Sequence, residues 1–117
     1  MAPVDLVTDY YDALDSHDYD HLQTLLDPAF AQHRPDRRFD SREAFVHFMR
    51  EERPQSDTTH RVHGLYVPAE GPDDRGDGTE VLARGDLLSG DDDPLFRFVD
   101  RFQVVEGRIA ELETFTR

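Results

Sequence analysis

Asp100 has the setting in this sequence that most directly suggests chemistry. Side chains alternate between the two faces of a strand, so a strand over 95–105 gives Asp100 apolar neighbours on its own face. These neighbours are Phe96, Phe98, Phe102 and Val104. A charged carboxylate among phenylalanines is costly, so it should be neutralised or paired. Asp100 is therefore either a protonated carboxylic acid that donates a hydrogen bond or the ionic partner of Arg84 or Arg61.

Tyr10 and His33 are the other two candidates for acid–base chemistry. The apolar spacing of residues 4–15 predicts a helix with Tyr10 near the middle of the buried stripe and Tyr11 at its rim. The Tyr10 hydroxyl then meets either a structural partner or a ligand. His33 ends a short expected strand, and a neutral imidazole is a competent base near pH 7. Its alternative role is a strand-end histidine bound to backbone or solvent.

The remaining polar clusters do not predict a metal or cofactor site. His60 and His63 are three apart on an expected strand, so they face opposite sides and form a poor metal pair. The run 91–93 lacks the ligand spacing of a calcium loop and is expected to be a solvated turn. There is no cysteine, and no P-loop, GxGxxG or GxSxG element. We expect neither a metal nor a cofactor.

Helices come first along the chain and strands follow. After the helix over 4–15, Asp18 is positioned to cap a second helix that Pro28 ends, and a strand is expected over 29–33. Asp40 and Glu43 resemble a capping box ahead of a third helix, which Pro54 ends. Strands are then predicted at 57–67, 79–89, 95–105 and 108–116, separated by hairpin signals. This order favours a single α+β domain over 1–117 with an antiparallel sheet.

Net charge restricts the partners of this chain. Aspartate and glutamate total 26 against 13 basic residues, all of them arginine, giving a net charge of −13. Such a surface repels phosphate backbones, so we expect no nucleic-acid partner. No signal peptide or membrane span is readable, which makes the cytoplasm the expected location. The charge pattern is typical of halophilic proteins; the alternative is an ordinary acidic protein from a GC-rich genome.

The halophile interpretation predicts that salt stabilises the fold. Self-repulsion among carboxylates opposes the compact state, and molar salt shortens the screening length to about 3 Å. We expect a higher melting temperature in about 2 M than in about 0.1 M KCl, measured by circular dichroism. An unchanged or lower midpoint in concentrated salt would contradict the interpretation.

A homodimer is also expected. The strand residues Val81, Leu82, Leu87 and Leu88 are apolar on both faces of the predicted sheet, and three helices cover only one face. A second copy of the chain is the simplest cover for the other face.

The segment DYYDALDSHDYD, at 9–20, resembles the opening of the nuclear transport factor 2-like superfamily, which includes SnoaL-like polyketide cyclases and ketosteroid isomerase. The likeness continues through LLDPAF, SREAFVHFM and VDRFQVVEGRIAELE, and so spans nearly the whole chain. It implies a cone-shaped fold in which three N-terminal helices pack on a strongly curved antiparallel sheet around a pocket. It also implies dimerisation.

The resemblance assigns roles to the three candidates. Tyr10 matches the hydrogen-bonding tyrosine of the isomerase, and Asp100 matches its protonated carboxylic acid. His33 stands where the isomerase has a carboxylate base, so the chain differs from that enzyme there. The expected pocket-lining residues are apolar: Leu14, Phe30, Phe45, Phe48, Phe98 and Phe102.

Two hypotheses about function follow from the resemblance. The first is an acid–base enzyme acting on a small apolar carbonyl compound, such as an isomerase, cyclase or dehydratase. The second is a non-catalytic ligand-binding or dimerisation module of the same fold. Fold alone does not decide between them, because function depends on the site.

Overall fold

The computed structural model describes residues 2–53, 57–69 and 78–117. Its helices are α1 (Pro3–Asp15), α2 (Tyr19–Leu25) and α3 (Arg42–His47), and α3 continues as a π-helical turn, η1 (Phe48–Glu52). Its strands are β1 (Leu26–His33), β2 (Arg38–Phe39), β3 (Thr59–Tyr66), β4 (Thr79–Leu88), β5 (Pro94–Val105) and β6 (Arg108–Thr116). The expected α+β order is confirmed.

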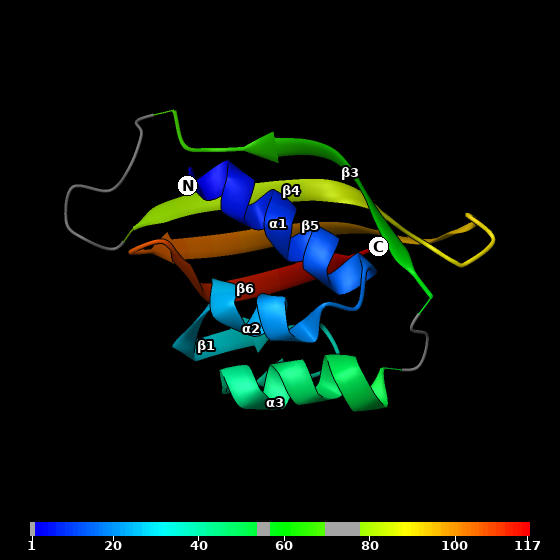
Figure 1. Cartoon of the computed structure of the whole chain (residues 1–117). Coiled ribbons are helices and arrows are strands. Elements are labelled where there is room, and N and C mark those ends of the chain that lie inside the picture. Colours follow the sequence, from blue (N-terminus) through cyan, green and yellow to red (C-terminus); the bar gives the residue numbers. More distant parts are fainter. Residues whose placement is uncertain (1, 54–56, 70–77) are drawn as a thin grey trace.

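The six strands form one sheet in the order β2-β1-β6-β5-β4-β3, and the helices lie against one of its faces (Figure 1). Strands β3 to β6 form an antiparallel meander, as predicted. The prediction of a wholly antiparallel sheet is wrong, because β1 pairs with β6 in parallel. In the sequence, β2, α3 and the strands β3 to β5 separate β1 from β6. The last strand, β6, lies beside β1 and runs in the same direction. The sheet is therefore mixed, and it does not close, since β2 and β3 are its edges.

Helix α1 places the first candidate side chains. A proline occupies its first turn, where no backbone N–H donor is needed, and Asp5 lies near the positive end of the helix dipole. Its buried face holds Leu6, Val7, Tyr10, Tyr11, Ala13 and Leu14. Tyr11 was expected at the rim of this face, but it is as buried as Tyr10, each being 3% exposed. The helix thus carries two adjacent tyrosines into the core.

The prediction for Pro28 is wrong. Asp18 caps α2 as expected, its side chain accepting a hydrogen bond from the His21 backbone N–H at 3.2 Å. However, α2 ends at Leu25 and the next residue is already extended, so β1 starts three residues earlier than predicted. Pro28 is exposed and lies where the pairing of β1 with β6 shifts register, a position that does not need its missing N–H.

The third helix is capped by Ser41 and not by Asp40. The Ser41 hydroxyl accepts from the Ala44 backbone N–H at 3.1 Å. Phe45, Phe48 and Met49 are buried as predicted, whereas Ala44 is exposed. Pro54, predicted to end this helix, lies outside the described residues, as does most of the expected hairpin turn before β4. Sequence periodicity did not predict β2, which is only two residues long.

The face of the sheet away from the helices carries exposed apolar side chains. Val99 and Phe115 are paired across β5 and β6 and are 37% and 51% exposed. Beside them Arg101 donates hydrogen bonds to Glu80, Glu111 and Glu113. The face is thus part apolar and part charged, and the homodimer stays a prediction.

Candidate functional site

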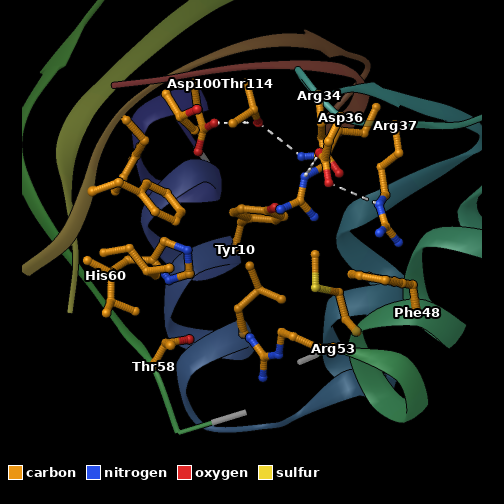
Figure 2. Close-up of a pocket in the computed structure, with 18 residues that line it drawn as sticks. Tyr10, Arg34, Asp36, Arg37, Phe48, Arg53, Thr58, His60, Asp100 and Thr114 are labelled. Atoms are coloured by element: carbon orange, nitrogen blue, oxygen red, sulfur yellow. Dashed lines mark hydrogen bonds and ion pairs between the residues drawn. The ribbon is translucent and has the colours of Figure 1, made fainter. Parts of the chain in front are cut away.

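A cavity of about 240 Å³ is lined by side chains from α1, β1, η1, all four meander strands and the turn between β1 and β2 (Figure 2). Its apolar wall includes Leu14, Phe48 and Phe98, three of the residues expected to line a pocket. Phe30, Phe45 and Phe102 are fully buried in the core and are not among its lining residues. The volume lies just under the range of roughly 300–1,000 Å³ for sites of drug-sized ligands, so this cavity suits a smaller molecule.

Asp100 lies in the wall of this cavity and is only 5% exposed. Its Oδ2 accepts a hydrogen bond from the Tyr11 hydroxyl at 2.6 Å, and its Oδ1 accepts one from the Thr114 hydroxyl at 2.6 Å. The alternative that Asp100 pairs with Arg84 or Arg61 is wrong, because both arginines are exposed. The carboxyl group is held by hydroxyl groups and not by a guanidinium.

Two opposing effects act on the Asp100 carboxyl group. Burial raises its pKa by disfavouring the charged form, while the hydrogen bonds from Thr114 and Tyr11 lower it. Burial is the larger effect, so the pKa of Asp100 is raised above its ordinary value. The protonated acid is thus more accessible here than at a surface aspartate.

Tyr10 presents a hydroxyl group that is available to a ligand. The residue lines the cavity, and its ring packs edge-on against Tyr11 and Phe102. Among the described residues, Tyr10 Oη makes no hydrogen bond. Burial, and next the negative charge of Asp100, raise its pKa well above the ordinary value, so the group stays protonated. Tyr10 is therefore a hydrogen-bond donor that faces the cavity.

Sequence reasoning missed the role of Tyr11. The resemblance assigns the hydrogen-bonding role to Tyr10, yet it is the hydroxyl of Tyr11 that donates to Asp100. Burial and Asp100 strongly raise the pKa of Tyr11 also, so it acts as a donor to that carboxyl group. The two adjacent tyrosines thus differ: the Tyr11 hydroxyl binds Asp100, and the Tyr10 hydroxyl faces the cavity.

His60 and Asp15 form a second polar group at this cavity. Asp15 Oδ1 lies 2.7 Å from His60 Nδ1, and Asp15 Oδ2 accepts from the His60 backbone N–H at 3.0 Å. Because a carboxylate oxygen accepts hydrogen bonds, we assign the imidazole proton to Nδ1, which leaves a lone pair on Nε2. The ring packs on Tyr11 at 5.0 Å and on Phe98 at 5.6 Å between centroids, and His60 lines the cavity. His60 is thus oriented as a hydrogen-bond acceptor or base.

The sequence contained only a weak signal for this pair. His60 shares a strand face with Val62, which packs against the core, so strand alternation directs it inwards. Its partner Asp15 is 45 residues away at the end of α1. The spacing of His60 and His63 in the sequence bears only on a metal pair and does not indicate this contact with Asp15.

The structure does not bring His33 to this cavity. Along β1 it is Phe30 and Gln32 that are buried, so His33 takes the opposite face, and it is not a lining residue. Gln32 Nε2 donates to Thr114 Oγ1 at 3.0 Å and so extends the hydrogen-bond chain to Asp100. Gln32 Oε1 is buried and has no hydrogen-bond partner within the described residues. It could accept from a ligand hydroxyl group.

A tight turn between β1 and β2 places two arginines at the cavity. The Arg34 backbone N–H donates to the Arg37 carbonyl oxygen at 2.8 Å, and both side chains line the cavity. Arg34 Nε lies 3.9 Å and Arg37 Nε 3.3 Å from the carboxylate of Asp36. The Arg37 guanidinium also stacks on the Phe48 ring, 4.5 Å from its centroid. Figure 2 shows this group on the opposite side of Tyr10 from His60.

Two further observations concern the described residues as a whole. They contain no group of three or more histidine, aspartate or glutamate side chains arranged to hold a metal ion. None of their helices has the length and apolar character needed to cross a membrane.

Residues 7–112 match the sequence profile of the SnoaL-like domain. The chain belongs to the SnoaL-like domain family. The resemblance inferred from the sequence is therefore confirmed. No curated protein sequence matches this SnoaL-like chain significantly.

Solved structures share the fold of this SnoaL-like chain. An NTF2-like protein of unknown function from Cytophaga hutchinsonii has a TM-score of 0.79 and 14% identity, covering 100% of this chain and 91% of that one. A proposed polyketide cyclase from Sinorhizobium meliloti has a TM-score of 0.75 and 22% identity, covering 95% and 94%. A proposed ketosteroid isomerase from Kribbella flavida has a TM-score of 0.71 and 22% identity, covering 96% and 75%. At these identities the likeness shows the fold alone.

Proposed function

We propose that this SnoaL-like chain is a cofactor-independent acid–base catalyst acting on a small, largely apolar carbonyl compound. The observation that carries the proposal is the convergence on one cavity of an oriented base, a hydroxyl donor and a buried carboxyl group. His60 replaces His33 as the proposed base. Tyr10 and Asp100 keep the roles expected for them.

The proposed step is the removal of a proton from the carbon next to the carbonyl group. The C–H bond breaks, its proton goes to His60 Nε2, and the electron pair moves to the carbonyl oxygen. Tyr10 donates a hydrogen bond to the developing oxyanion, and protonated Asp100 is positioned in the same wall to do so. Return of the proton to a different atom completes an isomerisation, and the same enolate serves a cyclisation or dehydration.

The names of the solved structures are consistent with this class of reaction. The proteins from Sinorhizobium meliloti and Kribbella flavida are described as a proposed cyclase and a proposed isomerase. Isomerisation and cyclisation both follow from the enolate that the proposed step forms. This agreement supports the class of reaction and leaves the substrate open.

We expect the protein to exchange the protons next to the carbonyl group of 2-tetralone for deuterium in D₂O. The measurement is proton NMR, with buffer alone as the blank. Tyr10→Phe should slow the exchange by at least about tenfold, because the oxyanion loses one donor. It should also weaken the binding of 2-naphthol, a planar analogue of the enol.

The control ligand for this experiment is decahydro-2-naphthol, which has the same ring size but is not planar. The wild-type protein should prefer 2-naphthol, because the site is complementary to an enolate. Binding of 2-naphthol without any exchange of 2-tetralone would contradict catalysis and favour the non-catalytic binding module.

A further inference from the structure

The charge of the cavity lining is opposite to that of the chain as a whole. Acidic residues outnumber basic ones 26 to 13 in the sequence. The described lining residues include three arginines but only two acidic residues. The arginines are Arg34, Arg37 and Arg53, and the acidic residues are Asp36 and Asp100. The lining of this cavity is thus richer in arginine than in acidic residues, although the protein as a whole is acidic.

The two arginines of the β1–β2 turn are held in place by more than one contact. They share a single carboxylate, Asp36, which is 63% exposed on its side chain, whereas the Arg34 side chain is only 25% exposed. One aspartate balances one of the two positive charges, so the turn keeps a net positive charge. Stacking of Arg37 on Phe48 fixes the second guanidinium without neutralising it.

The positive end and the acid–base end belong to the same cavity. Arg34 is close enough to Tyr10 and Asp100 that its charge opposes the increase in pKa that burial causes at both residues. Leu14 and Phe98 supply apolar surface in the same lining. A ligand that matches this arrangement needs an anionic group at one end, an apolar body, and an oxygen at the other end.

We infer that the ligand of this cavity is a small oxo- or hydroxy-carboxylic acid whose carboxylate binds Arg34 and Arg37. The planar guanidinium donates two parallel hydrogen bonds to a carboxylate, a geometry that a neutral amide cannot match. The carbonyl or enol oxygen of this acid faces Tyr10. This inference rests on the proposed function, because it assigns the second end of the same substrate.

The test compares two ligands of equal size, 4-hydroxyphenylacetate and 4-hydroxyphenylacetamide, by isothermal titration calorimetry. The wild-type protein should bind the acid at least about tenfold more tightly than the amide, the difference expected for a charge-assisted hydrogen bond. Arg34→Gln and Arg37→Gln should each reduce this preference, and Arg34→Lys should keep part of it. Concentrated KCl should reduce the ratio of the affinities for the acid and the amide, because salt screens the charge of the arginines.

Arg38→Gln is the matched control. It removes the same charge from the neighbouring residue, but Arg38 pairs with Asp40 and does not line the cavity. This variant should keep the full preference for the acid, which separates a direct contact from the general effect of one positive charge. Melting temperatures of all variants show whether a loss of binding reflects a loss of fold.

Equal binding of the acid and the amide by the wild-type protein would overturn the inference, as would no binding of either. Retention of the preference in both Arg34→Gln and Arg37→Gln would overturn it too. Exchange of 2-tetralone by the wild-type protein is independent of these outcomes, because 2-tetralone has no carboxylate. The proposed function can therefore stand if the carboxylate inference fails.

Discussion

Replacing His60 by glutamine should slow the deuterium exchange of 2-tetralone by about a hundred- to ten-thousandfold, the usual contribution of a general base. Glutamine keeps a polar side chain of similar length but has no basic lone pair at neutral pH. Binding of 2-naphthol should change little, because the hydroxyl donor Tyr10 remains in place. The expected loss is thus in turnover and not in affinity.

The strand that carries His60 also supplies its control. His63 lies on β3 with its Nε2 2.9 Å from Asp86 Oδ2, so it too is a histidine beside an aspartate, but it does not line the cavity. His63→Gln should leave exchange unchanged. Equal losses in the two variants, or none in His60→Gln, would remove His60 from the mechanism.

Asp15 has a positioning role that can be tested separately. In Asp15→Asn the amide can donate to Nδ1, which would move the imidazole proton to Nε2 and block the base. We expect exchange to fall while the affinity for 2-naphthol is retained. A merely structural role would lower the melting temperature and both functional readouts together.

Asp100→Ala should lower the free energy of unfolding by about 1–3 kcal/mol, because the Tyr11 hydroxyl loses its acceptor in a buried position. Asp100→Asn should lower it less, since the amide oxygen still accepts from Tyr11. Urea unfolding followed by circular dichroism measures both. Asp86→Ala, which removes a carboxylate from the opposite face of the sheet, is the control and should have a smaller effect.

The stabilising effect of Asp100 should depend on pH in a defined direction. Burial raises the pKa of Asp100 in the folded protein above the value of about 4 that an unfolded chain shows. Between these two values the folded protein binds more protons than the unfolded chain, so the free energy of unfolding falls as the pH rises through this window. Asp100→Asn should remove that part of the decrease. An identical pH dependence in the two proteins would show that the carboxyl group titrates normally.

Periodicity explains why much of the fold could be predicted. The helix over 4–15 and the four strands of the meander have regular apolar spacing, and the structure contains each within three residues of the expected bounds. The errors fall where local signals compete. Pro28 indicates a helix end, but the chain had already become extended at Leu26. Asp40 and Ser41 are both good caps, and only the backbone conformation of the intact turn selects Ser41.

The candidate site depends on contacts that no local pattern contains. Strand alternation directs Asp100 towards the helices, and helical periodicity directs Tyr10 to the same layer. The His60–Asp15 contact joins β3 to the end of α1, and the Arg34–Arg37 turn faces η1, so both require the tertiary fold. His33 was expected in the site, but its neighbour Gln32 lines the cavity. The two differ because successive residues of a strand face opposite sides of the sheet.

The parallel pairing of β1 with β6 has a consequence for protein synthesis. A ribosome makes Thr114 of β6 82 residues after Gln32 of β1, yet these two side chains are hydrogen-bonded beside Asp100. Until β6 is made, β1 has no parallel partner and α1 and α2 have only part of the sheet to cover. Contacts of such large sequence separation form late and slow folding. The newly made N-terminal half, with its exposed apolar helices, is therefore the part of this chain that most needs protection by chaperones during translation.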